Sequence, residues 1–144
     1  MLIPKELTPN APRLTPDKQP HFSGEKVKFD IRQWVLVTSF EPLVVYCYSS
    51  SYLRLCGSHF DLDDIQDLFK HLTNFSIQKG DAKVANVNED LIMQTEAFAE
   101  YVRTVLAAGC KNAAKSALFS SFDWQKDMLP KLSRIIVEVM QRSA

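Results

Sequence analysis

Three charged side chains occupy alternate positions in the stretch KFDIR, where Lys28, Asp30 and Arg32 are separated by apolar residues. In a β-strand such side chains share one face and lie roughly 6–7 Å apart, because a strand rises about 3.3 Å per residue. Two cations on one face can bind a polyanion, and an aspartate between them can accept hydrogen bonds from hydroxyl groups such as those of a ribose. The pattern therefore favours a nucleotide over a bare anion. The alternative is an ordinary solvent-facing side of a strand with alternating charges.

Two further stretches add polar side chains that could join this face. Arg54 stands between Leu53 and Leu55, so in a strand it points to the opposite side from both leucines and could reach the face of Asp30. The stretch HLTNFSIQK, residues 71–79, contains four polar side chains of interest: His71, Thr73, Asn74 and Lys79. Taken singly, a histidine satisfied within the fold or an asparagine in a turn would explain such residues equally well.

Several common kinds of site are not supported by the sequence. There is no G-x-x-x-x-G-K-[ST] and no G-x-G-x-x-G pattern, and only four glycines are present to build a phosphate-cradling loop. Cys47, Cys56 and Cys110 form no metal-like cluster, and their apolar neighbours favour reduced thiols in an intracellular protein. The acidic residues 61–64 lack the glycine and the spacing of a calcium loop. We therefore predict no metal ligands here.

Composition narrows the class of protein. The 144 residues suit one domain with a core. Lysine plus arginine equal aspartate plus glutamate at 17 each, which gives no support for a nucleic-acid or membrane-surface partner. No apolar run approaches the about 20 residues of a membrane span, and the first residues lack the apolar core of a signal peptide. These observations predict a cytoplasmic protein with neither nucleic acid nor membrane as a partner.

The elements that must position the charged residues are predicted to begin near residue 27. Residues 1–26 hold five of the seven prolines and no periodic apolar pattern, which predicts an extended or disordered segment. Three segments rich in β-branched and aromatic residues follow, and the serines at 49–51 are typical of a hairpin connection between the last two. The result is an antiparallel meander with a turn at residues 39–42 and strands at residues 27–38, 43–48 and 52–56.

Helices are predicted to cover this sheet. Asp61 is the predicted N-cap of a short helix with Leu62, Ile65 and Phe69 on one side. A longer helix is predicted from residue 88 to residue 108, with Gly109 as its terminator. The last helix is predicted near residues 124–142, where Pro130 should begin the regular part or kink it. The predicted fold class is α+β, an antiparallel meander packed with helices.

At these motifs the chain resembles a known family. The stretches KFDIRQWVLVTS…PL…Y…YLR and HLTNFSIQK are similar to the central part of the catalytic domain of tubulin–tyrosine ligase-like enzymes. The resemblance continues weakly through FAEYV and W…LP…SRIIVEVM, and covers residues 27–142. FDIRQW and SIQK look most like the glycylase branch, because the polyglutamylase branch more often has IN where this chain has Ile77 and Gln78.

The resemblance implies an ATP-grasp ligase that uses ATP and magnesium to activate a carboxylate as an acyl phosphate, which an amine then attacks. It implies glycine as the donor and the tails of tubulin or microtubules as the partner, in the cytoskeleton and the axoneme of a cilium or flagellum. By resemblance, Lys28 and Asp30 contact the nucleotide, and Arg32 and Arg54 stand near its phosphates and the reacting carboxylate as catalytic residues. The same resemblance implies a pocket lined by His71, Leu72, Thr73 and Asn74.

The chain also departs from the family's pattern. The family has lysines and a hinge upstream of KFDIR, where this chain has a proline-rich stretch, and a metal-binding W-L-I-E-x-N strand downstream, which this sequence does not contain. We therefore expect an extended segment at residues 1–26 and a partial ligase domain at residues 27–144, with the magnesium ligands outside the chain. The alternative is a catalytically inactive fragment that acts at most as a nucleotide- or tubulin-binding module.

Overall fold

The computed structural model describes residues 26–81 and 91–143. Residues 1–25 of the predicted proline-rich segment lie outside this range, as does residue 88, where the long helix is predicted to start. The chain divides into two compact units. We call them the site unit, with described residues 26–32, 51–81 and 91–94, and the helical unit, with described residues 33–50 and 95–143.

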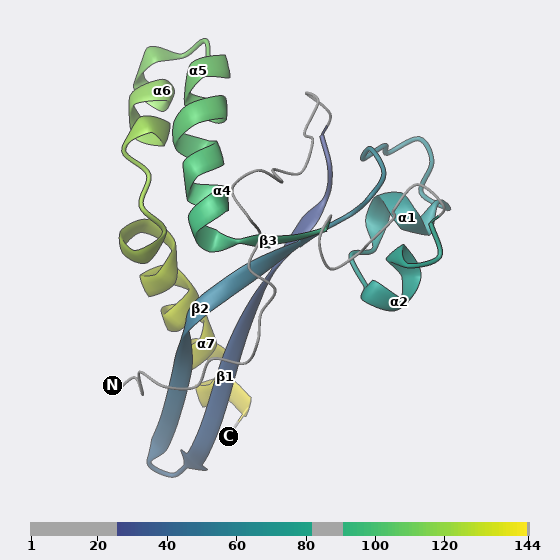
Figure 1. Ribbon diagram of the computed structural model, residues 1–144. Coiled ribbons are helices and arrows are strands. Elements are labelled where there is room, and N and C mark those ends of the chain that lie inside the picture. The colour runs from purple at the N-terminus through teal and green to yellow at the C-terminus, as the bar shows by residue number, and fades with distance from the viewer. Residues whose placement is uncertain (1–25, 82–90, 144) are drawn as a thin grey trace. The chain divides into compact units, whose positions relative to one another are not determined.

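A three-stranded antiparallel sheet provides the frame (Figure 1), with β1 (Phe29–Phe40), β2 (Leu43–Leu55) and β3 (Ile92–Gln94) in the order β1-β2-β3. The alternation predicted for β1 is confirmed from Ile31 to Phe40, where half-buried and exposed residues alternate, but not at Phe29, which is exposed. The predicted turn before the second strand is confirmed in a shorter form, because only Glu41 and Pro42 separate β1 from β2. Strand β1 therefore brings Asp30 and Arg32 into a regular extended conformation, and Lys28 precedes the strand.

The hairpin connection predicted at residues 49–51 is wrong, because β2 runs through Ser49, Ser50 and Ser51 without interruption. Serine breaks a hydrophobic pattern, but it keeps a backbone N–H and C=O for the strand ladder and does not require a left-handed turn. The third strand is instead β3, which pairs with β2 in the register Tyr52↔Gln94, Leu53↔Met93 and Arg54↔Ile92. Residues 52–56 thus belong to the middle strand of the sheet.

The core of the site unit gathers on the inner face of β2. Its buried apolar residues are Leu53, Leu55, Cys56, Leu91 and Met93. Backbone bonds fix the strand ends: Leu55 N–H donates to the Leu91 carbonyl at 2.8 Å, and Cys56 N–H donates to the Lys28 carbonyl at 2.9 Å. The end of β2 is therefore held from both sides, next to the start of the charged stretch.

Two short helices follow in the site unit, α1 (Leu68–His71) and α2 (Phe75–Gln78). The N-cap of α1 is Asp67, whose side chain accepts a hydrogen bond from Phe69 N–H at 3.0 Å. The prediction of Asp61 as the cap is wrong, because its carboxylate accepts from Asp63 N–H at 2.9 Å in a local turn. An Asx turn and a helix cap use the same aspartate oxygen, and the Asp61 side chain forms the Asx turn.

Helices dominate the other unit (Figure 1). A continuous helical stretch comprises α4 (Thr95–Tyr101), the π-helix η1 (Val102–Leu106) and α5 (Ala107–Gly109). Its predicted end at Gly109 is confirmed. The prediction that this helix includes residues 92–94 is wrong, because they form β3 and α4 begins at Thr95. Apolar residues on the inner side of a strand and of the helix that follows can mimic a longer helical period.

The remaining helices are α6 (Ala113–Ser120), the π-helix η2 (Trp124–Met128) and α7 (Leu129–Ser143). The last helix is confirmed, and its regular part begins beside Pro130 as expected. Pro130 has no N–H to donate to the carbonyl four residues earlier. The missing bond lies where the π-helix η2 gives way to the α-helix α7. Helix α6 was not predicted. Among the described residues, none of the helices combines the length and apolarity needed to cross a bilayer.

Aromatic rings join two parts of the helical unit. Phe98 on α4 meets the rings of Phe122 and Trp124 edge to face, with centroids 6.4 and 6.0 Å apart. Arg103 in η1 adds a hydrogen bond from its guanidinium to the Phe122 carbonyl at 3.1 Å. Edge-to-face pairs are worth about 0.5–1.5 kcal/mol beyond their buried area, so these contacts stabilise the packing of η2 against α4.

The buried thiol of Cys56 gives a first prediction. Burial raises its pKa from the ordinary value of 9.0 to about 11, against a smaller opposing effect of the positive charge of Lys28. A raised pKa means that the folded chain keeps a proton that the unfolded chain releases, so this group destabilises the fold as pH rises from 9.0 toward about 11. Urea unfolding at pH 8 and at pH 10.5 should show a smaller loss of stability for Cys56→Ala than for the parent chain. Equal losses in the two proteins would contradict the prediction.

Candidate functional site

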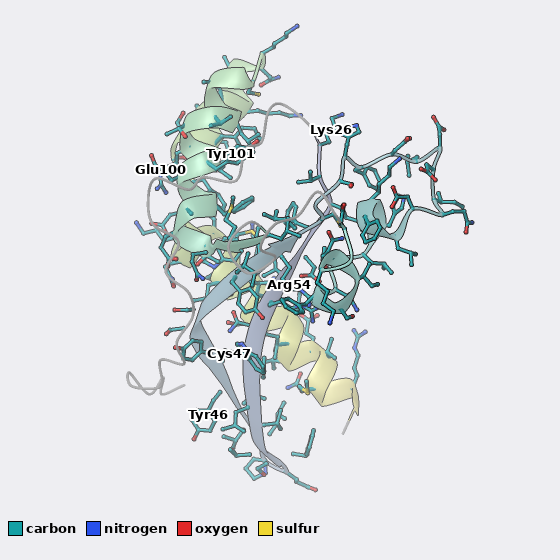
Figure 2. The ribbon with its side chains drawn as sticks, turned by 45° about the vertical axis from the view of Figure 1, so that its right-hand side comes forward. Lys26, Tyr46, Cys47, Arg54, Glu100 and Tyr101 are labelled. Atoms are coloured by element: carbon teal, nitrogen blue, oxygen red, sulfur yellow. The ribbon has the colours of Figure 1, made fainter. Side chains whose placement is uncertain are left out.

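The candidate site is centred on the carboxylate of Asp30 in β1. Arg54, which comes from β2 and is labelled in Figure 2, donates from Nε to Asp30 Oδ1 at 3.1 Å and from Nη2 to Oδ2 at 2.8 Å. This bidentate geometry fixes the plane of the guanidinium group as well as its position. The expectation that Arg54 shares a face with Asp30 is confirmed.

Two more side chains approach the same carboxylate. Thr73 donates its hydroxyl proton to Asp30 Oδ2 at 2.7 Å, and the same hydroxyl oxygen accepts from Arg54 Nη2 at 3.3 Å. Arg32 places its Nη2 atom 3.1 Å from Asp30 Oδ2. We call these four residues, Asp30, Arg32, Arg54 and Thr73, the Asp30 cluster. All four belong to the site unit.

The donors of the cluster gather mainly on one oxygen of the carboxylate, Oδ2. An ionised carboxylate has about four lone-pair positions, and Asp30 is approached by two N–H groups of Arg54, one of Arg32 and the hydroxyl of Thr73. Three of these donors converge on Oδ2 and one meets Oδ1, so a ligand hydroxyl could approach Asp30 at Oδ1 without replacing a donor. The geometry favours Asp30 as the residue that orders the two arginines.

The cluster keeps a positive charge. Two guanidinium groups share one carboxylate, so one unit of positive charge is not neutralised within the group. The Arg54 side chain is 18% exposed and that of Arg32 is 44% exposed. A partly desolvated charge that is held in place interacts more strongly with an anion than a mobile surface charge does. The exposed Lys28 lies two residues before Asp30 in the sequence.

The segment 71–79 divides into residues that reach the cluster and residues that do not. Among the described residues, the contact from this segment to Asp30 is made by Thr73, which is buried. His71 instead lies 3.0 Å from the Asp64 carbonyl through Nε2 and meets the ring of Phe60 edge-on. Leu72 is exposed, and its carbonyl accepts a hydrogen bond from a glutamine side chain. Asn74 and Lys79 are also exposed and occupy the N-cap and C-cap positions of α2.

That glutamine, Gln78, is a residue that the sequence interpretation missed. Its side chain is completely buried and makes three hydrogen bonds, to Gly57 N–H at 2.9 Å and to the carbonyls of Phe69 and Leu72 at 3.1 and 2.6 Å. The signal in the sequence was a glutamine within a specific motif, SIQK, and nothing local indicated which backbone groups it would bind.

The described residues do not contain a cluster of metal ligands. In residues 26–81 and 91–143, no three His, Cys, Asp or Glu side chains gather closely enough to hold a metal ion. The guanidinium and hydroxyl groups of the Asp30 cluster suit the binding of an anion.

Comparison with known proteins finds similarity to a family and to several proteins that are named for the modification of tubulin. The family described as "Tubulin-tyrosine ligase family" matches residues 20–130. Tubulin glycylase 3E of Tetrahymena thermophila is 41% identical over 117 residues, which are 81% of this chain and 7% of that protein. Tubulin glycylase 3A of Drosophila melanogaster is 38% identical over 86 residues, which are 56% of this chain and 8% of that protein.

A relative with another printed activity matches as well. Probable tubulin polyglutamylase TTLL2 of Mus musculus is 29% identical over 115 residues, which are 78% of this chain and 18% of that protein. The chain spans less than a fifth of the length of each of these three relatives. The matched region contains every residue of the Asp30 cluster.

Proposed function

Because the chain belongs to the tubulin–tyrosine ligase family, we propose that it binds the phosphate groups of ATP within a ligase that joins glycine to glutamate side chains of tubulin. The observation that carries this proposal is the Asp30 cluster, in which one carboxylate orders two guanidinium groups and leaves a net positive charge. The glycylase relatives support glycine as the amino acid that is added. Association with microtubules, including those of an axoneme, is part of the same proposal.

Each residue of the cluster has a defined part in this proposal. Arg54 and Arg32 offer their remaining N–H groups to phosphate oxygens, while Asp30 holds the guanidinium planes in place. Thr73 bridges Asp30 and Arg54, so that the pair cannot rotate freely. ATP, when bound, supplies the phosphoryl group that activates a carboxylate for amide formation. Cations fixed before the reaction stabilise the charge that develops in such a transfer.

Magnesium and the ATP-grasp fold enter the proposal through the family resemblance and not through the Asp30 cluster. The cluster suits a phosphate, but the described residues offer no set of carboxylates for magnesium, so we assign no residue of this chain to that ion. The three-stranded antiparallel sheet with helices is compatible with part of an ATP-grasp domain.

A second candidate function is the addition of glutamate. The specific observation in its favour is the similarity to Probable tubulin polyglutamylase TTLL2 over 78% of this chain. A further alternative is a module that binds a nucleotide or tubulin without catalysis. The two enzymatic candidates share the Asp30 cluster and differ in the amino acid that is transferred.

A chimera tests these alternatives. The matched residues of this chain would replace the corresponding segment of tubulin glycylase 3E, and the purified chimera would be incubated with ATP, magnesium, microtubules and either labelled glycine or labelled glutamate. We expect ATP-dependent incorporation of glycine above that of glutamate. Preferred incorporation of glutamate would support the second candidate, and ATP binding without incorporation would support the binding module. A folded chimera that does not bind ATP would overturn the proposal.

A further inference from the structure

We propose that Gln78 is a positioning residue for the Asp30 cluster, which it orients by holding the segment that carries Thr73 against the end of β2. This inference deepens the function proposed above and rests on it for the identity of the ligand. The geometry that carries the inference does not depend on a ligand.

The side-chain amide of Gln78 joins three parts of the site unit. Its oxygen accepts from Gly57 N–H at 2.9 Å, just beyond the end of β2. Its nitrogen donates to the Phe69 carbonyl in α1 at 3.1 Å and to the Leu72 carbonyl at 2.6 Å. The side chain is completely buried, so water cannot replace these bonds. Both protons of the amide nitrogen are used, and its oxygen has a partner.

The path from Gln78 to the cluster is short. The Leu72 carbonyl that it holds is part of the peptide bond to Thr73, which donates to Asp30 at 2.7 Å and accepts from Arg54 at 3.3 Å. Gly57, on the other side of the amide, follows Arg54 by three residues in the sequence. One side chain thus fixes the distance between the segment of Thr73 and the strand of Arg54.

The length of the side chain is essential to this role. Asparagine is shorter by one methylene group, so an amide at the same backbone position cannot reach all three partners. The groups left behind are buried backbone N–H and C=O groups, and unpaired groups of this kind are costly. The segment would move to find other partners, and the Thr73 hydroxyl would move with it.

The experiment compares Gln78→Asn with Gln66→Asn, the same change at an exposed position of the same unit. Two readouts on the whole chain are the NMR resonance of the Arg54 Nε–H group and the Kd for ATP from calorimetric titration. In Gln78→Asn we expect the resonance to shift toward that of a solvated arginine and the Kd to rise roughly tenfold, with the circular dichroism spectrum unchanged. Gln66→Asn should leave both readouts as they are. An unchanged Arg54 resonance in a folded Gln78→Asn chain would overturn the inference.

A double-mutant cycle separates positioning from general loosening. If Gln78 acts through Thr73, combining Gln78→Asn with Thr73→Val should weaken ATP binding little more than the stronger single change does. Additive effects would show that the two residues act independently, and the inference would fall.

The two proposals can fail separately. If the parent chain does not bind ATP, the proposed function fails, while the Arg54 resonance still decides the role of Gln78. If the variants do not fold, hydrogen exchange in the unaltered chain gives the decision. The Gln78 side-chain N–H and the Arg54 Nε–H should show similar protection, because one local opening exposes both. Strong protection of one and none of the other would overturn the inference.

Discussion

Replacing Arg54 by alanine is expected to raise the Kd for ATP by about 10- to 150-fold, the range that corresponds to losing a charge-assisted hydrogen bond worth roughly 1.5–3 kcal/mol. Arg54 is the best-ordered cation of the cluster, because two bonds to Asp30 and one to Thr73 fix its guanidinium group. Its side chain is also the less exposed of the two arginines. Calorimetric titration of the whole chain with ATP measures the change.

Matched variants decide whether charge or geometry is responsible. Arg54→Lys keeps the positive charge but loses the bidentate contact with Asp30, so its affinity for ATP should lie between that of Arg54→Ala and that of the parent chain. Arg134→Ala removes an exposed arginine of α7, whose Nε lies 3.8 Å from Glu138, and should leave the Kd unchanged. An equal loss in Arg134→Ala and Arg54→Ala would show that ATP senses only the net charge of the chain.

The carboxylate of Asp30 sharpens this test. Asp30→Asn removes a negative charge, and if simple charge attraction governed binding, ATP affinity would rise. If Asp30 orders the arginines, as its contacts with Arg32, Arg54 and Thr73 indicate, affinity should fall despite the gain in net positive charge. Tighter binding by Asp30→Asn would contradict the ordering role.

The charged face could be predicted from the sequence because it depends on a local property. Side chains at alternate positions of any strand share a face, so Asp30 and Arg32 were placed together without knowledge of the fold. Arg54 was also placed correctly, although the strand boundaries around it were wrong. Its orientation relative to Leu53 and Leu55 requires only that the three residues are extended.

The rest of the site depends on contacts between distant segments. Thr73 reaches Asp30 across 43 positions of sequence, and Gln78 reaches Gly57 across 21. No local sequence pattern indicates which backbone groups a glutamine will bind, because most glutamines lie at exposed positions and bind water. The family resemblance indicated the segment 71–79 as a whole, and the structure selects Thr73 and Gln78 within it.

The start of the long helix was missed for a related reason. Leu91 and Thr95 are both buried, as a helical stripe would require, but the residues between them form β3. The short strand gains its stability from pairing with β2 in the register that joins Leu53 to Met93. A three-residue strand has too few positions to show a period of its own, so tertiary pairing decides its conformation.

This pairing makes Leu53 the position where a small change should cost the most stability. Its side chain is 0% exposed, it lies in the central strand, and its Cα partner Met93 is itself buried. Leu53→Ala should lower the free energy of unfolding by about 2–5 kcal/mol, because buried apolar contacts are lost and the sheet on either side limits how far the cavity can collapse.

Leu62→Ala is the matched control, since Leu62 belongs to the same unit but is 72% exposed. The same deletion of side-chain atoms there should change the free energy of unfolding by no more than about 0.5 kcal/mol. Urea unfolding of the two variants and the parent chain measures the difference, with the slope of the transition as a check that the same structure unfolds. If Leu53→Ala cost no more than Leu62→Ala, β2 would not be the centre of a packed core. The support of Arg54 by a rigid strand would then have to be given up, because a cation on a loosely held strand cannot be ordered before its ligand arrives.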